Sequence, residues 1–220
     1  MDAGKVLGIL GRTGSGKTTM ARLVCRLYDP QGGSISYNNH DSKELELSQL
    51  QTRIAYVTQD VQLFQASVRD NLTFFRGDVS DERLLTLIDE MGLESWYKGL
   101  SHGLDTVLQS GGKGLSAGEG QLLAFLRAFL RNPAIVILDE ASSRLDPATE
   151  VLIEKAVTRL LKGRTGIIIA HRLKTLDRVD DILILDDGHA VEGGTRLELL
   201  EKKDSLFNHL LKKGLEEVMV

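Results

Sequence analysis

The stretch GRTGSGKT, residues 11 to 18, holds three glycines and ends in a lysine and a threonine. It matches G-x-x-x-x-G-K-[ST], follows an apolar run and opens a helical pattern, which is the context that this motif requires. Glycines let backbone amides wrap phosphates, Lys17 can reach the β- and γ-phosphates, and Thr18 can hold Mg²⁺. An ordinary glycine-rich turn is the alternative. The predicted nucleoside triphosphate loop comprises Gly11, Arg12, Thr13, Gly14, Ser15, Gly16, Lys17, Thr18 and Thr19.

Two adjacent acids end the apolar run IVILDE. Asp139 at the end of such a strand would lie beside the phosphate loop and could hold Mg²⁺ through water. Glu140 could position the attacking water or accept its proton. Capping of the next turn is the alternative function of these two acids.

Two further polar residues follow predicted strands, Gln59 in YVTQD and His171 in IIIAHR. A glutamine can contact both Mg²⁺ and the attacking water, and a histidine can donate a hydrogen bond to a γ-phosphate. Each alone could be a simple strand-end residue. Because parallel strands end at the same edge of a sheet, their shared position favours a common crevice.

A second stretch, LSAGEGQLL at residues 115 to 123, places a serine and two glycines before a leucine-rich helical run. Exposed amides at a helix start attract phosphate. The chain therefore has two phosphate-facing helix starts, about a hundred residues apart. A flexible loop followed by a helix cap is the alternative.

Composition limits the class of protein. The 220 residues carry a net charge of −4, which argues against a protein that coats nucleic acid. Cys25 is the only cysteine, so an internal disulfide and a cysteine metal site are excluded and a reducing compartment is favoured. The longest apolar runs are too short to cross a bilayer. We therefore expect a soluble chain that can dock on a membrane partner.

The pattern of short apolar runs predicts an α/β fold. Strands are expected at 5–10, 53–58, 134–139, 165–170 and 181–186, and nearly all-apolar runs of this kind suit a parallel sheet covered by helices. A helix is expected over Lys17–Leu27, another after Asp146 and Pro147, and an amphipathic one after Ser205. GGSISYNNHD predicts a small strand and turn. We expect one domain over 1–220, with a core at about 1–66 and 132–220 and an inserted helical subdomain at about 67–131.

These motifs, in this order and over nearly the whole chain, resemble the nucleotide-binding domain of ATP-binding-cassette (ABC) transporters. Residues 11–18 resemble Walker A, Gln59 the Q-loop glutamine, and Leu115–Gln121 the family signature LSGGQ. Ile135–Asp139 with Glu140 resembles Walker B and the catalytic glutamate, while Ser143–Asp146 resembles the D-loop and His171 the switch histidine. The resemblance implies a P-loop NTPase (RecA-like) core with a mostly parallel sheet and a small antiparallel part, ATP and Mg²⁺ as ligands, and ATP hydrolysis that powers transport.

The resemblance also implies a reason for the second helix start. In the family, two domains pair head to tail, so that Ser116 and Gly118 of one chain would cap the γ-phosphate held by Lys17 of the other. Asp146 would join this composite site, in a homodimer or a heterodimer. QDVQLFQASVRDNL, residues 59 to 72, resembles the exporter type, in which Leu63 and Phe64 would meet a transmembrane domain. They could equally belong to the subdomain core. The implied location is the cytoplasmic face of the cell membrane.

Several positions depart from the family pattern. Ala117, Glu119 and Gly120 replace commoner residues in the signature, and Ser110 stands where exporters often have a glutamate. Only ten residues precede Gly11, without the aromatic residue that stacks on adenine. We therefore expect an N-terminally truncated cassette whose ATP affinity is about ten-fold or more below that of a complete domain. A soluble cassette ATPase unrelated to transport, and a cassette that binds ATP with little turnover, are the alternative functions.

Overall fold

A computed structural model describes the chain except residues 59, 110–114, 140–145, 171–172 and 214–220, and the side chains of 173, 174 and 213. The chain forms two compact units. The sheet unit comprises Met1–Tyr56, Pro133–Ala141 and Gly163–Val220, and the helical unit comprises Val57–Asn132 and Ser142–Lys162. The predicted subdomain ranges, which place 142–162 in the core, stay a prediction.

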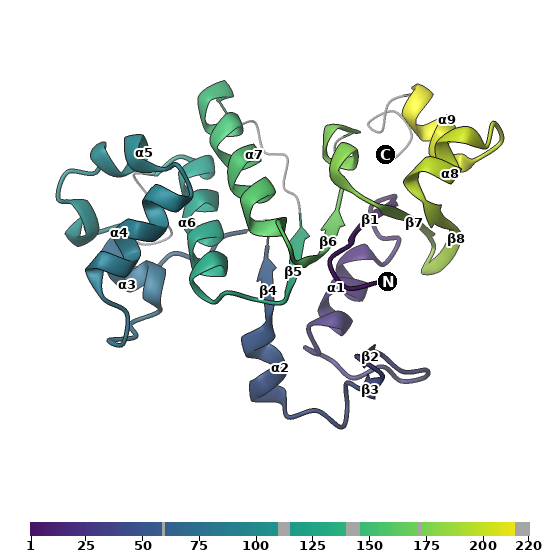
Figure 1. Ribbon diagram of the computed structural model, residues 1–220, viewed down its shortest axis with the longest axis horizontal. Coiled ribbons are helices and arrows are strands. Elements are labelled where there is room, and N and C mark those ends of the chain that lie inside the picture. Colours follow the sequence, from purple (N-terminus) through teal and green to yellow (C-terminus); the bar gives the residue numbers. More distant parts are fainter. Residues whose placement is uncertain (59, 110–114, 140–145, 171–172, 214–220) are drawn as a thin grey trace. The chain divides into compact units, whose positions relative to one another are not determined.

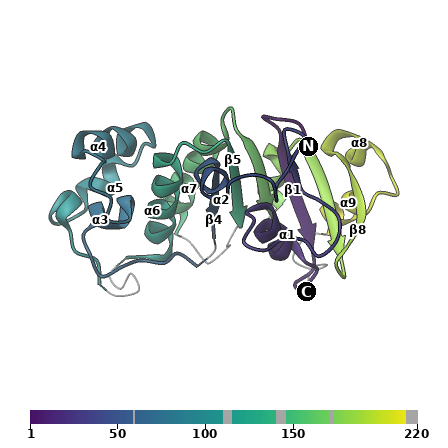
Figure 2. The same cartoon turned by 90° about the horizontal axis from the view of Figure 1, so that it is seen from below.

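A six-stranded sheet forms the sheet unit, in the order β4-β5-β6-β1-β7-β8 (Figures 1 and 2). β1 (Val6–Gly11) is parallel to both β6 (Thr165–Ile169) and β7 (Asp181–Asp186), and β5 (Ile135–Asp139) is parallel to β6. β8 (His189–Thr195) is antiparallel to β7, and β4 (Ile54–Val57) lies at the other edge. The predicted α/β class with a mostly parallel sheet is confirmed.

The central strands are apolar on both faces. Ile9 pairs in register with Ile169, and Ile137 with Ile167; all four are 4% exposed or less. Burial of each such side chain contributes about 1.5–3 kcal/mol. This packing fixes the ends of β1 and β5, where the phosphate loop and Asp139 lie.

Short elements complete the sheet unit. Where a small strand and turn were predicted, β2 (Ser36–Tyr37) and β3 (His40–Asp41) form a small antiparallel hairpin. Asn38 and Asn39 both have positive φ, as a two-residue turn of type I′ requires. α1 covers Lys17–Val24 and is shorter than predicted, because Arg26 adopts a positive φ of 50°. The other helices of this unit are α2 (Leu47–Arg53), the 3₁₀ helix η3 (Leu173–Arg178), α8 (Arg196–Glu201) and α9 (Leu206–Lys213).

The helical unit gathers α3 (Val68–Thr73), α4 (Asp81–Glu90), α5 (Glu94–Lys98) and the 3₁₀ helix η1 (Gly103–Asp105) beside α6 (Ala117–Leu130) and α7 (Pro147–Leu161) (Figure 1). The expected cap of α7 is present, since the Asp146 carboxylate accepts a hydrogen bond from the Thr149 amide at 3.0 Å. Within the described part of the chain, each helix is too short or too polar to cross a bilayer.

Candidate nucleotide-binding site

The phosphate loop joins the end of β1 to the start of α1, and its glycines are required by geometry. Gly11 has a φ of 147°, and a Cβ built there would lie 2.2 Å from the carbonyl oxygen of Leu185 and 2.5 Å from Ser15 Oγ. Gly16, the N-cap of α1, has a φ of 100°. Only glycine adopts these conformations without strain, so the sequence spacing corresponds to a tightly folded loop.

Lys17 points into this loop. Its ammonium donates to the carbonyl oxygens of Gly11 at 2.6 Å and Arg12 at 2.8 Å, and the residue is 6% exposed. Burial lowers the pKa of Lys17, and the nearby Asp139 carboxylate acts in the opposite direction. A cation held against carbonyls at a helix N-terminus can exchange these bonds for phosphate oxygens.

The other loop residues divide into exposed and buried groups. Ser15 is buried, and among the described residues its hydroxyl has no hydrogen-bond partner. The Gly188 amide, in the turn between β7 and β8, donates to the Ser15 carbonyl at 3.1 Å, and this hydrogen bond stabilises the conformation of the phosphate loop. The exposed members are Arg12, Thr13, Gly14 and Thr19.

Three polar side chains meet at the end of β5. Asp139 Oδ2 lies 3.4 Å from Thr18 Oγ1, at the start of α1, and 3.0 Å from the hydroxyl of Tyr56 on β4. Burial, and then the charge of Asp139, raise the pKa of Tyr56, so the phenol stays protonated and donates. Sequence reasoning missed Tyr56. A single hydroxyl in the otherwise apolar run IAYV, which needs a partner when buried, is the signal that could have identified it.

The second helix start belongs to the helical unit. Ser116 is exposed and caps α6: its hydroxyl accepts from the Glu119 amide at 3.2 Å, and Glu119 Oε2 accepts from the Ser116 amide at 2.7 Å. This reciprocal capping box explains why a glutamate suits position 119. Gly118 is buried in the first turn. Asp146 is exposed at the start of α7 in the same unit, and its hydrogen bonds from Thr149 lower the pKa of its carboxyl group.

Three predicted catalytic residues, Gln59, Glu140 and His171, lie outside the described residues, as do Ser110 and the first three residues of the D-loop-like segment. Their predicted functions stay predictions. Among the described residues, histidine, cysteine and acidic side chains form no cluster of three or more that could hold a metal ion.

The family model described as ABC transporter matches residues 1–143, well over half of the chain. The chain belongs to the ABC transporter family. It is 42% identical over 202 residues to the uncharacterized ABC transporter ATP-binding protein YknV of Bacillus subtilis (strain 168), covering 92% of this chain and 33% of that protein. It is also 41% identical over 203 residues to the ATP-dependent lipid A-core flippase of Photorhabdus laumondii subsp. laumondii, covering 92% of this chain and 35% of that protein.

The chain thus spans about a third of the length of these curated relatives. Membership of the ABC family confirms the predicted resemblance, and with it the assignment to the ATP-binding ATPase domains of transporters.

A buried polar network in the helical unit of this ABC domain was not predicted. Asn71, on α3, is 0% exposed; its Oδ1 accepts from the Phe64 amide at 2.9 Å, and its Nδ2 donates to backbone carbonyls of the loop at 64–67. Arg127, on α6, donates to Asn71 Oδ1 at 3.0 Å, to the Asn71 carbonyl at 2.6 Å and to the Gln62 carbonyl at 2.7 Å. Burial lowers the pKa of Arg127 to about 10. Asn71 and Arg127 thus join the loop that follows Gln59 to the helix that begins at the signature.

Three exposed phenylalanines lie next to this network. Phe64 packs edge to face against Phe74 and Phe75, at centroid distances of 6.2 and 5.5 Å, and the Arg127 guanidinium lies 4.6 Å from the Phe74 ring centre. Their exposed fractions are 42%, 44% and 59%, respectively. We call these three residues the aromatic patch.

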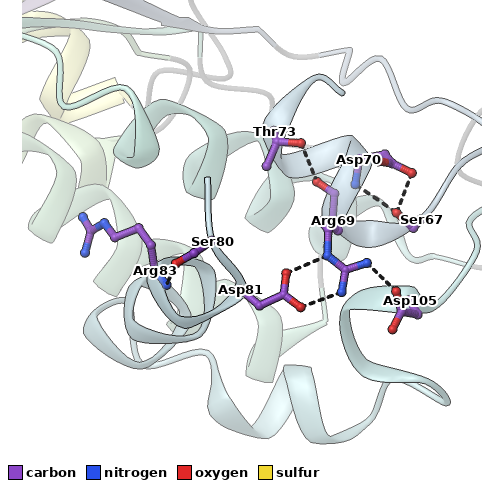
Figure 3. A network of polar contacts seen from close by, with 8 residues as sticks. All are labelled: Ser67, Arg69, Asp70, Thr73, Ser80, Asp81, Arg83 and Asp105. Carbon is purple, nitrogen blue, oxygen red and sulfur yellow. Dashed lines mark hydrogen bonds and ion pairs between the residues drawn. The ribbon is translucent and has the colours of Figure 1, made fainter. Parts of the chain in front are cut away.

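Arg69 holds α3 in place, and Phe74 and Phe75 of the aromatic patch directly follow this helix. Figure 3 shows Arg69, on α3, between Asp81 at the start of α4 and Asp105 of η1, with ion pairs to both. Both nitrogens of one edge of its guanidinium bind Asp81, at 2.6 and 2.7 Å, which gives a fixed bidentate geometry. Ser67 caps the same helix through the Asp70 amide at 3.0 Å.

Proposed function

We propose that this chain is the ATP-hydrolysing domain of an exporter-type ABC transporter, and that ATP drives its head-to-tail dimerisation. The observation that supports this most strongly is the buried Lys17 ammonium, held by two carbonyls inside a glycine loop at the start of α1. Phosphates of ATP would take the place of these carbonyls as acceptors. The loop amides and the helix dipole would add to the attraction.

The residues next to Lys17 fit Mg²⁺ as a second ligand. Thr18 Oγ1 and Asp139 Oδ2 are hard oxygen donors 3.4 Å apart. One hydroxyl and one carboxylate, without a larger acidic cluster in the described residues, are typical of Mg²⁺ that keeps several waters and binds phosphate oxygens. Bound there with ATP, the ion would neutralise charge on the β- and γ-phosphates. By resemblance, Gln59 would add a ligand to this ion.

The hydrolysis step is assigned by resemblance to residues beyond the described ones. Glu140 would accept a proton from water as the water oxygen forms a bond to the γ-phosphorus, and the bond from that phosphorus to the β,γ-bridging oxygen would break to release ADP. His171 would donate a hydrogen bond to the γ-phosphate, and Gln59 would contact the water. General base catalysis of this kind contributes about 10²–10⁴-fold to the rate.

The partner chain would complete the site. Ser116 is exposed, and its oxygen accepts from the Glu119 amide, so its hydroxyl proton can point to a γ-phosphate of the other chain. By resemblance, Gly118 would lie beside the same γ-phosphate, and Asp146 would lie at the same dimer interface. The partner would be an identical chain or a related one.

A transmembrane domain is the second proposed partner, at the cytoplasmic face of the membrane. The aromatic patch supports this, because three adjacent exposed phenylalanines are typical of an interaction site. The relatives named as flippases are nearly three times as long as the part that matches this chain, which leaves room for such a domain. Their similarity also supports the exporter type.

Glu140→Gln tests the proposal, because it keeps the shape of the side chain and removes its charge. The variant should bind ATP with unchanged affinity, lose hydrolysis by orders of magnitude, and accumulate an ATP-dependent dimer in light scattering. Lys17→Ala is the control, in which ATP binding and the dimer should both be lost. Full turnover by Glu140→Gln would refute the proposal.

A further inference from the structure

A tyrosine hydroxyl lies against the carboxylate that we propose for Mg²⁺. Tyr56 is half-buried on β4, and its hydroxyl donates to Asp139 Oδ2 at 3.0 Å. Thr18 Oγ1 is 3.4 Å from the same oxygen. β4 and β5 are neighbours in the sheet, so a strand beside Asp139 supplies this donor.

The shorter of these two contacts, that from the Tyr56 hydroxyl, determines the orientation of the Asp139 carboxylate. The last torsion of an aspartate is broad, so hydrogen bonds and not rotamer preference fix the plane of its oxygens. A hydroxyl contact of 3.4 Å is beyond the usual range, whereas 3.0 Å lies at its limit and gains strength from the charge of the acceptor. A phenol attached to a strand through a rigid ring is also a fixed donor.

We propose that Tyr56 is a positioning residue for the metal site: it holds the Asp139 carboxylate in the orientation in which it faces Mg²⁺. This inference rests on the proposed function. Tyr56 would contact neither nucleotide nor metal and would act through Asp139 alone. Groups that hydrogen-bond to a metal ligand typically contribute ten-fold or more to metal affinity.

A purely structural function of the hydroxyl makes a different prediction. If Asp139 served only to satisfy a half-buried phenol, loss of the hydroxyl would change the stability of the sheet unit and leave metal affinity unchanged. Tyr37 is a matched control, because it is also half-buried in the sheet unit and its hydroxyl donates to a backbone carbonyl, that of Val24, instead of to a carboxylate.

The test compares Tyr56→Phe and Tyr37→Phe with the wild-type chain. The affinity of a non-hydrolysable ATP analogue is measured first by calorimetry, in buffer freed of divalent metal and without added chelator. Mn²⁺ is then added to the saturated complex, and its affinity is measured from the EPR signal of free Mn²⁺. Circular dichroism and urea unfolding confirm that both variants are folded.

Tyr56→Phe should leave the metal-free affinity for the analogue unchanged and weaken Mn²⁺ binding about ten-fold, whereas Tyr37→Phe should change neither. Wild-type Mn²⁺ affinity in Tyr56→Phe would overturn this inference and leave the proposed function standing. A wild-type chain that did not bind the analogue at all would overturn the proposed function, and this inference with it.

Discussion

Replacement of Asn71 by alanine should be among the most damaging single changes in the helical unit. The side chain is fully buried and makes five hydrogen bonds, three to backbone carbonyls, one to the Phe64 amide and one to Arg127. Asn71→Ala removes all five at once and leaves a space where the amide was.

The expected loss follows from which partners are left without a bond. The carbonyls of Phe64, Ala66 and Ser67 each accept a second, backbone hydrogen bond, so they remain satisfied. The Phe64 amide loses Asn71 Oδ1, its acceptor among the described residues. The Arg127 guanidinium loses one of its three hydrogen-bond acceptors. A buried donor left without a partner costs about 1–3 kcal/mol, so the two lost bonds together predict a decrease of about 2–6 kcal/mol in the free energy of unfolding.

Trp96 makes the measurement specific to this unit. It is the only tryptophan of the chain and is buried on α5, so its fluorescence during urea unfolding follows the helical unit. Thr73→Val is the matched control: Thr73 is also buried on α3, but its hydroxyl bonds to the Arg69 carbonyl one turn earlier, and its loss should cost about 0.5–1.5 kcal/mol. If Asn71→Ala cost no more than Thr73→Val, the reasoning about this network would be refuted.

Three further changes give separate tests. Gly11→Ala should lower the free energy of unfolding by about 3 kcal/mol or more and abolish ATP binding, because its Cβ would lie 2.2 Å from a backbone carbonyl oxygen. Gly14 has open space around it but a positive φ, so Gly14→Ala should lower the free energy of unfolding by only about 1–2 kcal/mol. Equal losses of stability in the two variants would argue against the close approach at Gly11. Gly120→Ala should stabilise α6 by about 0.5–1 kcal/mol in urea unfolding, because its Cβ would meet only Leu63 Cδ1 at 3.7 Å; destabilisation would contradict this. Burial raises the pKa of Cys25 to about 11, so a thiol reagent at pH 8 should react with the unfolded chain within minutes and with the folded chain far more slowly, and equal rates would show that the thiol is accessible.

The elements that the sequence predicted are those whose own residues determine them. The runs at 135–139 and 165–169 are buried on both faces, so a string of apolar residues was a sufficient signal. α7 was predictable because Asp146 and Pro147 mark its start. β8 was not predicted, because its seven residues are mostly exposed and include Gly193 and Gly194; pairing with β7 makes it a strand. α2 was missed for a similar reason, since only Leu50 is buried and no apolar period is visible.

The residues of the site also fall into two groups, those that the sequence predicted and those that became known only from the fold. The phosphate loop was predictable because its backbone geometry demands glycines at fixed positions, and the predicted Asp139 lies within 3.4 Å of Thr18 Oγ1. Tyr56, Asn71 and Arg127 were missed because their partners are far away in the sequence, up to 83 residues for Tyr56 and 56 residues between Asn71 and Arg127. A lone arginine in the leucine-rich run of α6 was a visible signal, because a buried guanidinium needs several acceptors. Its partners became known only from the fold.

The central claim, that Lys17 of one chain and the signature of another act on one nucleotide, is tested most directly by mixing two inactive variants. Lys17→Ala breaks one part of the site and Gly118→Asp the other, since a carboxylate beside a γ-phosphate is repulsive by several kcal/mol where water is excluded. Mixed dimers of the two would contain one site with both parts broken and one intact site, so ATP hydrolysis should partly return. Wild type mixed with the double variant should give inactive mixed dimers, because each site then has one broken part. The reverse result, no activity in the first mixture and, in the second, a wild-type rate that does not fall as the double variant is added in excess, would show that both parts act within one chain and would contradict the account.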